Sequence, residues 1–398
     1  MEIDIHSLKT YNDLARDGAT AAADALSELT GVETRVTVTD VSLLSSSDLR
    51  STFAEREFAG VDVSLGSPLS GETVLAFDQD GREAITSGLV PTQDPERVEG
   101  AIVEVGNIMA NGFIGGWADH LDTKVEVSPP EYVEGRGIDV LPDRMIDADE
   151  YVFAFRSRVE IVSEGVEFQI LLLPEIESLG ELIETQEQSG VSVEKLEVFT
   201  EMTKQGAAKA ADNVTAMTGL PTAVDVNRLR FLPITDIPAQ VGDDRRVGTV
   251  VEYTGPTSGY LAILFDPETA RTSVDALLPV ESDEAWDDRE QGALEELCNV
   301  VASGFIDGWA NVLETSIRHS PPTFITDMGS SIVSPIIADI ARTDDYAFLL
   351  DSTIETDANE PLQCQLFALP RRDELESALD DLLVERADKT TVSPDELF

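Results

Sequence analysis

The chain contains one segment twice, and this internal repeat constrains the fold more than any other feature. Residues 104–130 read EVGNIMANGFIGGWADHLDTKVEVSPP, and residues 296–322 read ELCNVVASGFIDGWANVLETSIRHSPP. The two segments align without a gap, and about half of their positions are identical, including Trp117 and Trp309. Two unrelated amphipathic helices would not match rare residues in place, so the repeat predicts a duplication.

The similarity continues on both sides of this segment, so the repeated unit has the length of a domain. Residues 18–31 match residues 206–219, and further matches follow late in each half. A repeat of this length is far longer than a solenoid unit. We therefore expect one domain at residues 1–190, a second at 191–385 and a flexible tail at 386–398.

Hydrophobic periodicity in the first copy predicts two long helices and about six strands. The expected helices span residues 8–30 and 95–123. The expected strands include residues 33–48, 59–65, 72–78, 151–162 and 166–173. The pair Asp80-Gly81 is interpreted as a hairpin turn. With the same order in the second copy, these elements predict an α/β (α+β) fold with a mainly antiparallel sheet in each domain.

The charge of the chain is strongly negative. Asp and Glu number 77 against 27 Lys and Arg, which gives a net charge of −50. The acids are interleaved with helix and strand patterns, which favours a folded protein with an acidic surface over a disordered acidic tail. Such surfaces are typical of halophilic microbes with a salt-filled cytoplasm, since salt screens the self-repulsion. This charge disfavours binding to nucleic acids and to anionic membranes.

Cysteine and histidine are too scarce and too dispersed for common metal or disulfide frameworks. Cys298 and Cys364 are the two cysteines, and His6, His120 and His319 lie far apart. We expect no disulfide framework and no metal site. The sequence shows no secretory signal and no membrane-length apolar run, so we expect a cytoplasmic protein, monomeric with two internal copies.

One helix face is repeated in both copies. Glu104, Asn107 and Asn111 lie at i, i+3 and i+7 of the predicted helix 95–123, so they share one face. The corresponding residues are Glu296, Asn299 and Ser303. A solvated helix face is one interpretation, and close helix packing explains the neighbouring glycines. Alternatively, the carboxylate binds a cationic partner, and the amide holds a water molecule in line with a phosphorus atom.

At these residues the chain resembles the CheC/CheX/FliY family of chemotaxis phosphatases. The family motif is Glu-x-x-Asn followed about 22 residues later by Pro. Glu104, Asn107 and Pro129 match this motif, and so do Glu296, Asn299 and Pro321. The resemblance implies two CheC-like domains, each a pseudo-twofold with two long helices.

The resemblance also implies that the first helix of each copy has lost its motif. Asp13 and Arg16 stand where Glu and Asn are expected, and Glu201 and Lys204 occupy these positions in the second copy. We interpret these as degenerate positions, which leaves two sites rather than four. Gly100 and Gly292 stand where the family often has Asp or Ser, four residues before the Glu, so the helix start is expected to be looser.

By this resemblance, the expected function is dephosphorylation of the phospho-aspartyl response regulator CheY. The glutamates Glu104 and Glu296 would pair with the regulator's active-site lysine, and Asn107 and Asn299 would position the attacking water. The Mg²⁺ ion belongs to the regulator, so no cofactor is expected in this chain, and the deamidase CheD is a further expected partner. The alternative is a non-catalytic adaptor that binds CheD, CheY or a motor-switch component.

Overall fold

The computed structural model divides into two compact units. The first unit comprises Ile3–Ser189, and the second comprises Gly190–Phe398 with Met1–Glu2. The structure describes residues 2–3, 5–31, 33–44, 49–50, 57–89, 94–120, 124–141, 152–161, 166–175, 178, 191–219, 221–278, 286–313, 315–356 and 363–380. The predicted tail at 386–398 lies outside these residues. Within this described part, no helix is both long enough and apolar enough to cross a membrane.

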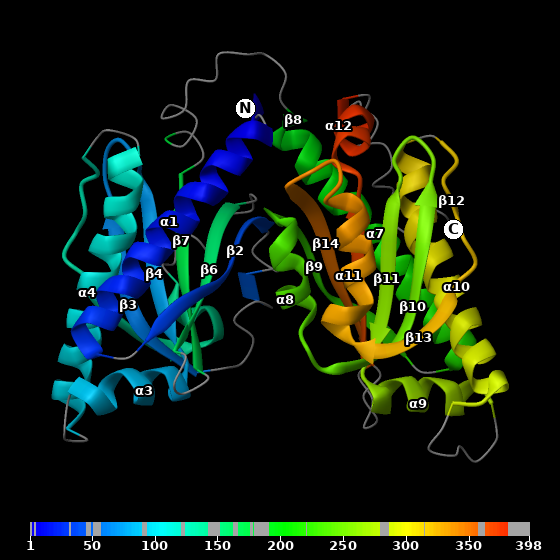
Figure 1. Cartoon of the computed structure of the whole chain (residues 1–398), viewed down its shortest axis with the longest axis horizontal. Helices are drawn as coiled ribbons and strands as arrows, with labels where there is room; N and C mark the ends of the chain where they lie inside the picture. The colour runs from blue at the N-terminus through cyan, green and yellow to red at the C-terminus, as the bar shows by residue number, and fades with distance from the viewer. Residues whose placement is uncertain are drawn as a thin grey trace, which may run out of the picture. The chain divides into compact units, whose positions relative to one another are not determined.

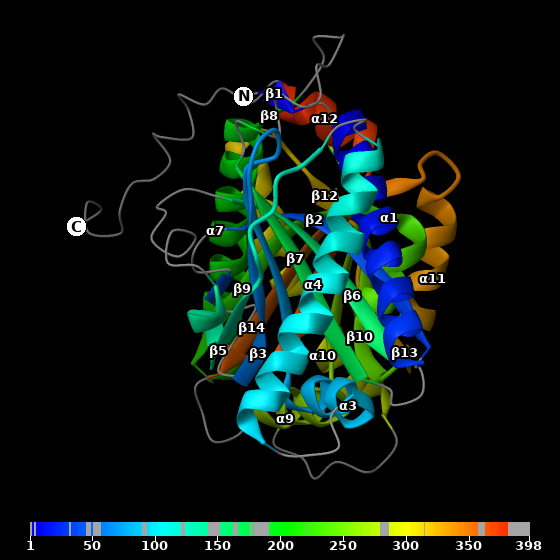
Figure 2. The ribbon, with the colours of Figure 1, turned by 90° about the vertical axis from the view of Figure 1, so that its left-hand side faces the viewer.

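The first unit is built on one antiparallel sheet with the strand order β2-β6-β7-β4-β3-β5. Its strands are β2 (Thr34–Leu44), β3 (Glu57–Leu65), β4 (Gly71–Phe77), β5 (Glu131–Arg136), β6 (Val152–Ile161) and β7 (Val166–Pro174). Its helices are α1 (Ile5–Thr30), α3 (Gln79–Leu89), α4 (Pro95–His120) and the 3-10 helix η1 (Gly137–Val140). The long helices α1 and α4 contact each other and lie on the same face of the sheet (Figures 1 and 2).

The second unit repeats this arrangement with the strand order β9-β14-β15-β11-β10-β13. Its strands are β9 (Thr222–Pro233), β10 (Arg245–Thr254), β11 (Gly259–Phe265), β12 (Arg318–His319), β13 (Thr323–Met328), β14 (Tyr346–Thr356) and β15 (Gln363–Pro370). Its helices are α7 (Val193–Thr218), α8 (Ile237–Val241), α9 (Pro267–Leu277), α10 (Asp288–Val312), α11 (Gly329–Ile340), α12 (Arg372–Asp380) and η2 (Ile234–Asp236). The chain also contains two short strands of two residues each, β1 (Glu2–Ile3) and β8 (Val191–Ser192).

Both faces of each sheet are buried where the central strands run. In β11, Leu261 to Phe265 are all buried, because alternate side chains face α10 on one side and α8 with α11 on the other. In β7, Leu171 to Leu173 form a similar continuous apolar run. The mixed fold with a mainly antiparallel sheet is therefore confirmed, as are the two predicted strand pairs of the first copy. Of the predicted elements, residues 45–48, 121–123, 151 and 162 lie outside the described part.

The prediction of a hairpin turn at Asp80-Gly81 was wrong. These residues belong to the first turn of α3, and the backbone N–H of Gly81 donates to Oδ1 of Asp78 at 3.0 Å. Asp78 thus caps the helix in the way that a turn aspartate would otherwise stabilise a hairpin. The same position in the second unit, Asp266, precedes Pro267 at the start of α9.

Glycines allow the two long helices of each unit to touch. A Cβ atom on Gly18 would lie 2.6 Å from the carbonyl oxygen of Phe113, and one on Gly116 would lie 2.9 Å from the Cα of Gly18. In the second unit, a Cβ on Gly206 would lie 2.9 Å from the carbonyl oxygen of Phe305. Among the glycines of α4, close helix packing is therefore confirmed for Gly116 and for Gly112, on which a Cβ would lie 3.1 Å from the carbonyl oxygen of Ala21.

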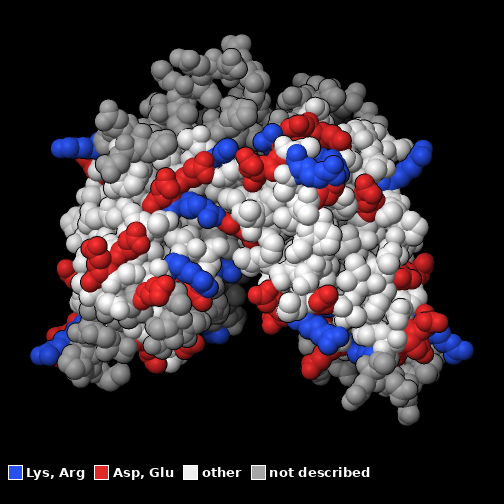
Figure 3. Space-filling model, viewed as in Figure 1, with Lys and Arg blue, Asp and Glu red and all other residues white. Residues whose placement is uncertain are grey.

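Acidic and basic side chains lie beside one another on the face drawn in Figure 3. Exposed ion pairs on the described residues include Arg35–Glu160 at 2.7 Å and Arg82–Glu134 at 2.8 Å. Each such pair contributes little to the free energy of unfolding. They show that arginines on this surface lie among carboxylates.

Candidate functional site

The Glu-x-x-Asn pair of the first unit lies on the outward side of α4. Glu104 is exposed and Asn107 is half-buried, whereas Val105 and Met109 are fully buried against the sheet. Asn111 continues the same face one turn later and is exposed. A helix with one apolar stripe on the sheet necessarily turns this polar stripe toward solvent.

The carboxamide of Asn107 is held by Asn111. The Nδ2 atom of Asn111 donates to the backbone carbonyl oxygen of Asn107 at 2.7 Å and to its Oδ1 atom at 3.1 Å. Within the described residues, no further hydrogen bond of the Asn107 side chain and none of the Glu104 carboxylate is found. Both groups are therefore available to an incoming partner.

The second unit presents the same pair on α10. Glu296 is exposed and Asn299 is half-buried, while Leu297 and Cys298 are fully buried beneath them. This helix begins with a capping box, in which the Asp287 side chain accepts the N–H of Glu290 and Glu290 accepts the N–H of Asp287. The start of α10 is therefore fixed, which differs from the loose start expected from Gly292.

Ser303, the counterpart of Asn111 in the second unit, forms different hydrogen bonds. Oγ of Ser303 lies 3.1 Å from Nε2 of His319, and Nδ1 of His319 lies 2.9 Å from the carbonyl oxygen of Ser320. Because a carbonyl oxygen can only accept, Nδ1 carries the proton and Nε2 of a neutral ring accepts from Ser303. Ser303 is therefore turned toward β12 and not toward Asn299.

In each unit, the motif proline follows a serine that forms two hydrogen bonds with a strand of the sheet. In the first unit, Ser128 donates its N–H to the carbonyl oxygen of Ser64 at 2.9 Å and accepts the Ser64 N–H on its Oγ at 3.0 Å. Ser320 forms the same two bonds with Glu252 in the second unit, at 2.8 and 3.0 Å. Pro129 and Pro321 directly follow these serines and are exposed. The shared Ser-Pro-Pro sequence was the signal for this anchor, which sequence reasoning missed.

The degenerate positions lie on the neighbouring helices. Asp13 and Arg16 are half-buried on α1, which packs against α4. Glu201 is exposed and Lys204 half-buried on α7, which packs against α10. In both units a cation thus stands where the motif has its amide, while the acid is Asp13 in the first unit and a retained Glu201 in the second.

Gly100 and Gly292 are exposed, and a Cβ atom at either position would meet no atom within 4 Å. Gly115, further along the same face of α4, is equally open. Close packing within the unit therefore does not explain these three glycines, unlike Gly18 and Gly116.

The two cysteine thiols of the chain lie in the interior. Cys298 and Cys364 are buried and free, and burial raises the pKa of the Cys298 thiol to about 12. A thiol with such a pKa is a poor nucleophile near neutral pH. Among the described residues, no group of three or more His, Cys, Asp or Glu side chains is arranged to hold a metal ion.

These features define a class of protein: a duplicated α/β domain that presents an acid–amide pair on an outward helix face of each copy. A family model described as chemotaxis phosphatase CheX matches residues 247–340. A protein of Halobacterium salinarum named "Putative CheY-P phosphatase CheC1" is 32% identical over 189 residues, which cover 46% of this chain and 96% of that protein. The chain therefore belongs to the CheC/CheX/FliY family of chemotaxis phosphatases.

Solved structures similar to this chain include members of the same family. FliY of Thermotoga maritima is 14% identical, with a TM-score of 0.39, and the match covers 48% of this chain and 96% of FliY. CheX of Vibrio vulnificus is 14% identical, with a TM-score of 0.30, and the match covers 43% of this chain and 96% of CheX.

Proposed function

We propose that this protein dephosphorylates a phospho-aspartyl response regulator of the CheY type, with one active site in each unit. The observation that carries the proposal is the outward Glu-x-x-Asn pair, which both units retain on equivalent helices. We call Glu104 and Asn107 the first site, and Glu296 and Asn299 the second site. The relative named for CheY-P phosphatase activity supports the choice of substrate.

The carboxylates Glu104 and Glu296 bind the partner. An exposed carboxylate on a helix can pair with a lysine ammonium of the regulator and so align the two proteins. Neither carboxylate is tied to another described group, so pairing with the regulator breaks no internal bond. The carboxylates thus determine the affinity for the regulator, and the amides act in the hydrolysis of its aspartyl phosphate.

The amides Asn107 and Asn299 position the attacking water. Hydrolysis forms a bond between the water oxygen and phosphorus and breaks the bond between phosphorus and the aspartyl oxygen, which releases inorganic phosphate and the free aspartate. A carboxamide can accept from the water and donate to it or to a phosphoryl oxygen. Such a reaction needs mainly orientation, because the phosphoryl group is already activated as an acyl phosphate with the regulator's Mg²⁺. This chain contributes no cofactor.

The test is the decay of a phosphorylated CheY-type regulator in molar salt. The wild-type chain should accelerate the decay, the Asn107→Ala/Asn299→Ala double variant should not, and each single variant should keep one site. The loss at each altered site should be about 10²–10³-fold in turnover. Asn311→Ala removes an exposed amide from α10 that lies 12 residues, about three turns, beyond Asn299, and this control should match wild type.

Equal decay with the wild type and the double variant would remove the catalytic proposal. A pull-down with the regulator or with CheD would then decide for the adaptor, whose binding should fall with Glu104→Ala/Glu296→Ala. A CheD contact alone, with no effect on regulator decay, would favour the adaptor as well.

A further inference from the structure

The two sites differ in how their catalytic amide is held. In the first unit, Nδ2 of Asn111 bonds both the backbone oxygen and Oδ1 of Asn107, at 2.7 and 3.1 Å. The backbone oxygen can only accept, so the Asn111 atom facing it must be the amide nitrogen. The same nitrogen then requires an acceptor on Asn107, which fixes the Oδ1 atom of Asn107 toward Asn111 and its Nδ2 atom away.

We call the two hydrogen bonds from Asn111 to Asn107 the clamp. With the clamp formed, specific donors and acceptors of the Asn107 side chain remain free for the reaction. The Oδ1 atom of Asn107 keeps a second lone pair, and its Nδ2 atom keeps two N–H groups. The carboxamide can no longer rotate by half a turn without losing the 3.1 Å bond and setting two N–H groups against each other. The direction in which Asn107 accepts and donates is therefore determined before the partner arrives.

The second unit lacks the clamp. Asn111 corresponds to Ser303, whose hydroxyl is bonded to His319 at 3.1 Å. His319 in turn corresponds to Val127, which offers no such partner in the first unit. Among the described residues, the Asn299 side chain makes no hydrogen bond, so its carboxamide is held by torsional preference alone.

We infer that Asn111 is a positioning residue for Asn107, and that the first site consequently turns over faster than the second. The inference rests on the proposed phosphatase function. A preorganised amide need not be ordered in the transition state, which lowers the barrier without changing the affinity for the regulator. Asn111 acts through Asn107 and does not itself touch the substrate.

The experiment reads one site at a time. The Asn299→Ala chain reports the first site, and the Asn107→Ala chain reports the second. In the first background, Asn111→Ser should lower kcat about five- to tenfold, the worth of one hydrogen bond, and leave KM for the regulator within about twofold. Asn111→Asp, which keeps the size but cannot donate, should lower kcat at least as much.

In the Asn107→Ala background, the reverse substitution can be tested at the second site. Ser303→Asn should raise kcat of the second site, whereas Ser303→Ala, which only releases His319, should not. Asn111 and Ser303 are surface positions, and circular dichroism will check that each variant is folded.

Three results would overturn the inference while leaving the phosphatase in place. These are an unchanged kcat in Asn111→Ser, an effect on KM alone, and a second site faster than the first. If the wild-type chain does not accelerate decay at all, the proposed function itself fails, which is a separate outcome.

Discussion

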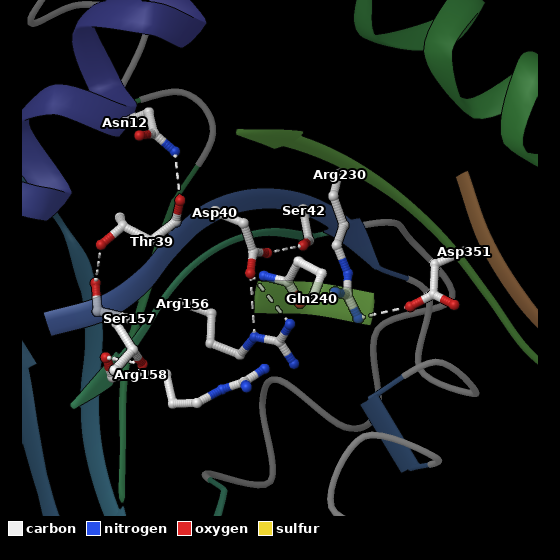
Figure 4. A network of polar contacts seen from close by, with 11 residues as sticks. Asn12, Thr39, Asp40, Ser42, Arg156, Ser157, Arg158, Arg230, Gln240 and Asp351 are labelled. Atoms are coloured by element: carbon white, nitrogen blue, oxygen red, sulfur yellow. Dashed lines mark hydrogen bonds and ion pairs between the residues drawn. The ribbon is translucent and has the colours of Figure 1, made fainter. Parts of the chain in front are cut away.

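The carboxylate of Asp40 lies 3.1 Å from the guanidinium of Arg156, directly across the β2–β6 ladder (Figure 4). Asp40 is fully buried, and its partner is only 12% exposed. In the second unit the order of charges is exchanged: Asp351 on β14 stands opposite Arg228 on β9 and is 3.0 Å from Arg230. The Asp and Arg positions that face each other are therefore exchanged between the two copies, and in the second unit Asp351 forms its ion pair with Arg230, two residues along β9 from the facing Arg228.

Removing one partner should be costly. Asp40→Ala leaves the guanidinium of Arg156 without its counter-charge, which should lower the free energy of unfolding by about 3–5 kcal/mol. Because the second unit shows the exchanged order, Asp40→Arg/Arg156→Asp should recover most of this loss. Urea titrations in molar KCl measure both variants. A double variant as unstable as Asp40→Ala would show that local geometry, not charge pairing, determines the effect.

Substitution of two glycines, Gly18 on α1 and Gly115 on α4, should change the free energy of unfolding in opposite directions. Gly18→Ala places a methyl group 2.6 Å from a backbone oxygen of α4, which should cost about 1–3 kcal/mol as the helices move apart. Gly115→Ala meets open space in a helix interior and should gain about 0.5–1 kcal/mol. Thermal unfolding compares the two variants. A loss in Gly115→Ala would mean that this face is covered in the folded chain.

The sequence predicted the elements whose pattern is imposed by burial. The alternation in residues 59–65 and the apolar run from Ile170 to Leu173 exist because these stretches are buried, so their pairing could be predicted from the sequence. Strand β5 was missed because no residue in it is fully buried, which leaves no periodic signal. The start of α3 was misread because an aspartate near a glycine stabilises a helix cap as well as a turn.

For the candidate site, helical spacing predicted which residues share a face but not how they are bonded. The four-residue step from Asn107 to Asn111 permits the observed bond, yet its direction depends on side-chain torsions that spacing does not determine. The contact of Ser303 with His319 depends on where β12 joins β10, a tertiary arrangement that the local sequence does not contain.

Stability should decline at high pH through the buried thiol. Desolvation raises the pKa of Cys298 from 9.0 to about 12, so between these values the unfolded chain has lost a proton that the folded chain retains. The stabilisation is complete below pH 9 and is lost between pH 9 and 12, at about 1.4 kcal/mol per pH unit. Cys298→Ala should give a shallower slope in that range, despite lower stability at pH 7. Equal slopes in urea titrations would show that other groups cause the decline.

Salt should stabilise the folded chain. With a net charge of −50, the carboxylates repel one another over about 10 Å at 0.1 M salt but only about 3 Å at 1 M. The Tm should therefore rise steeply between these concentrations of KCl. Sucrose, which does not screen charge, should raise the Tm far less. A similar rise with sucrose would point to preferential exclusion instead of screening.

The glutamate of each site should act on binding. In the Asn299→Ala background, Glu104→Gln keeps the shape but removes the charge that pairs with the regulator, so KM should rise about two- to fivefold in molar salt, while kcat changes less. Glu99→Gln is the matched control, because Glu99 is an exposed acid of α4 that lies off the polar face. An equal rise in KM for both variants would indicate that the loss of one negative charge weakens binding wherever it lies on α4, and that Glu104 does not pair specifically with the regulator. A fall in kcat at constant KM in Glu104→Gln would instead assign this carboxylate to the chemical step.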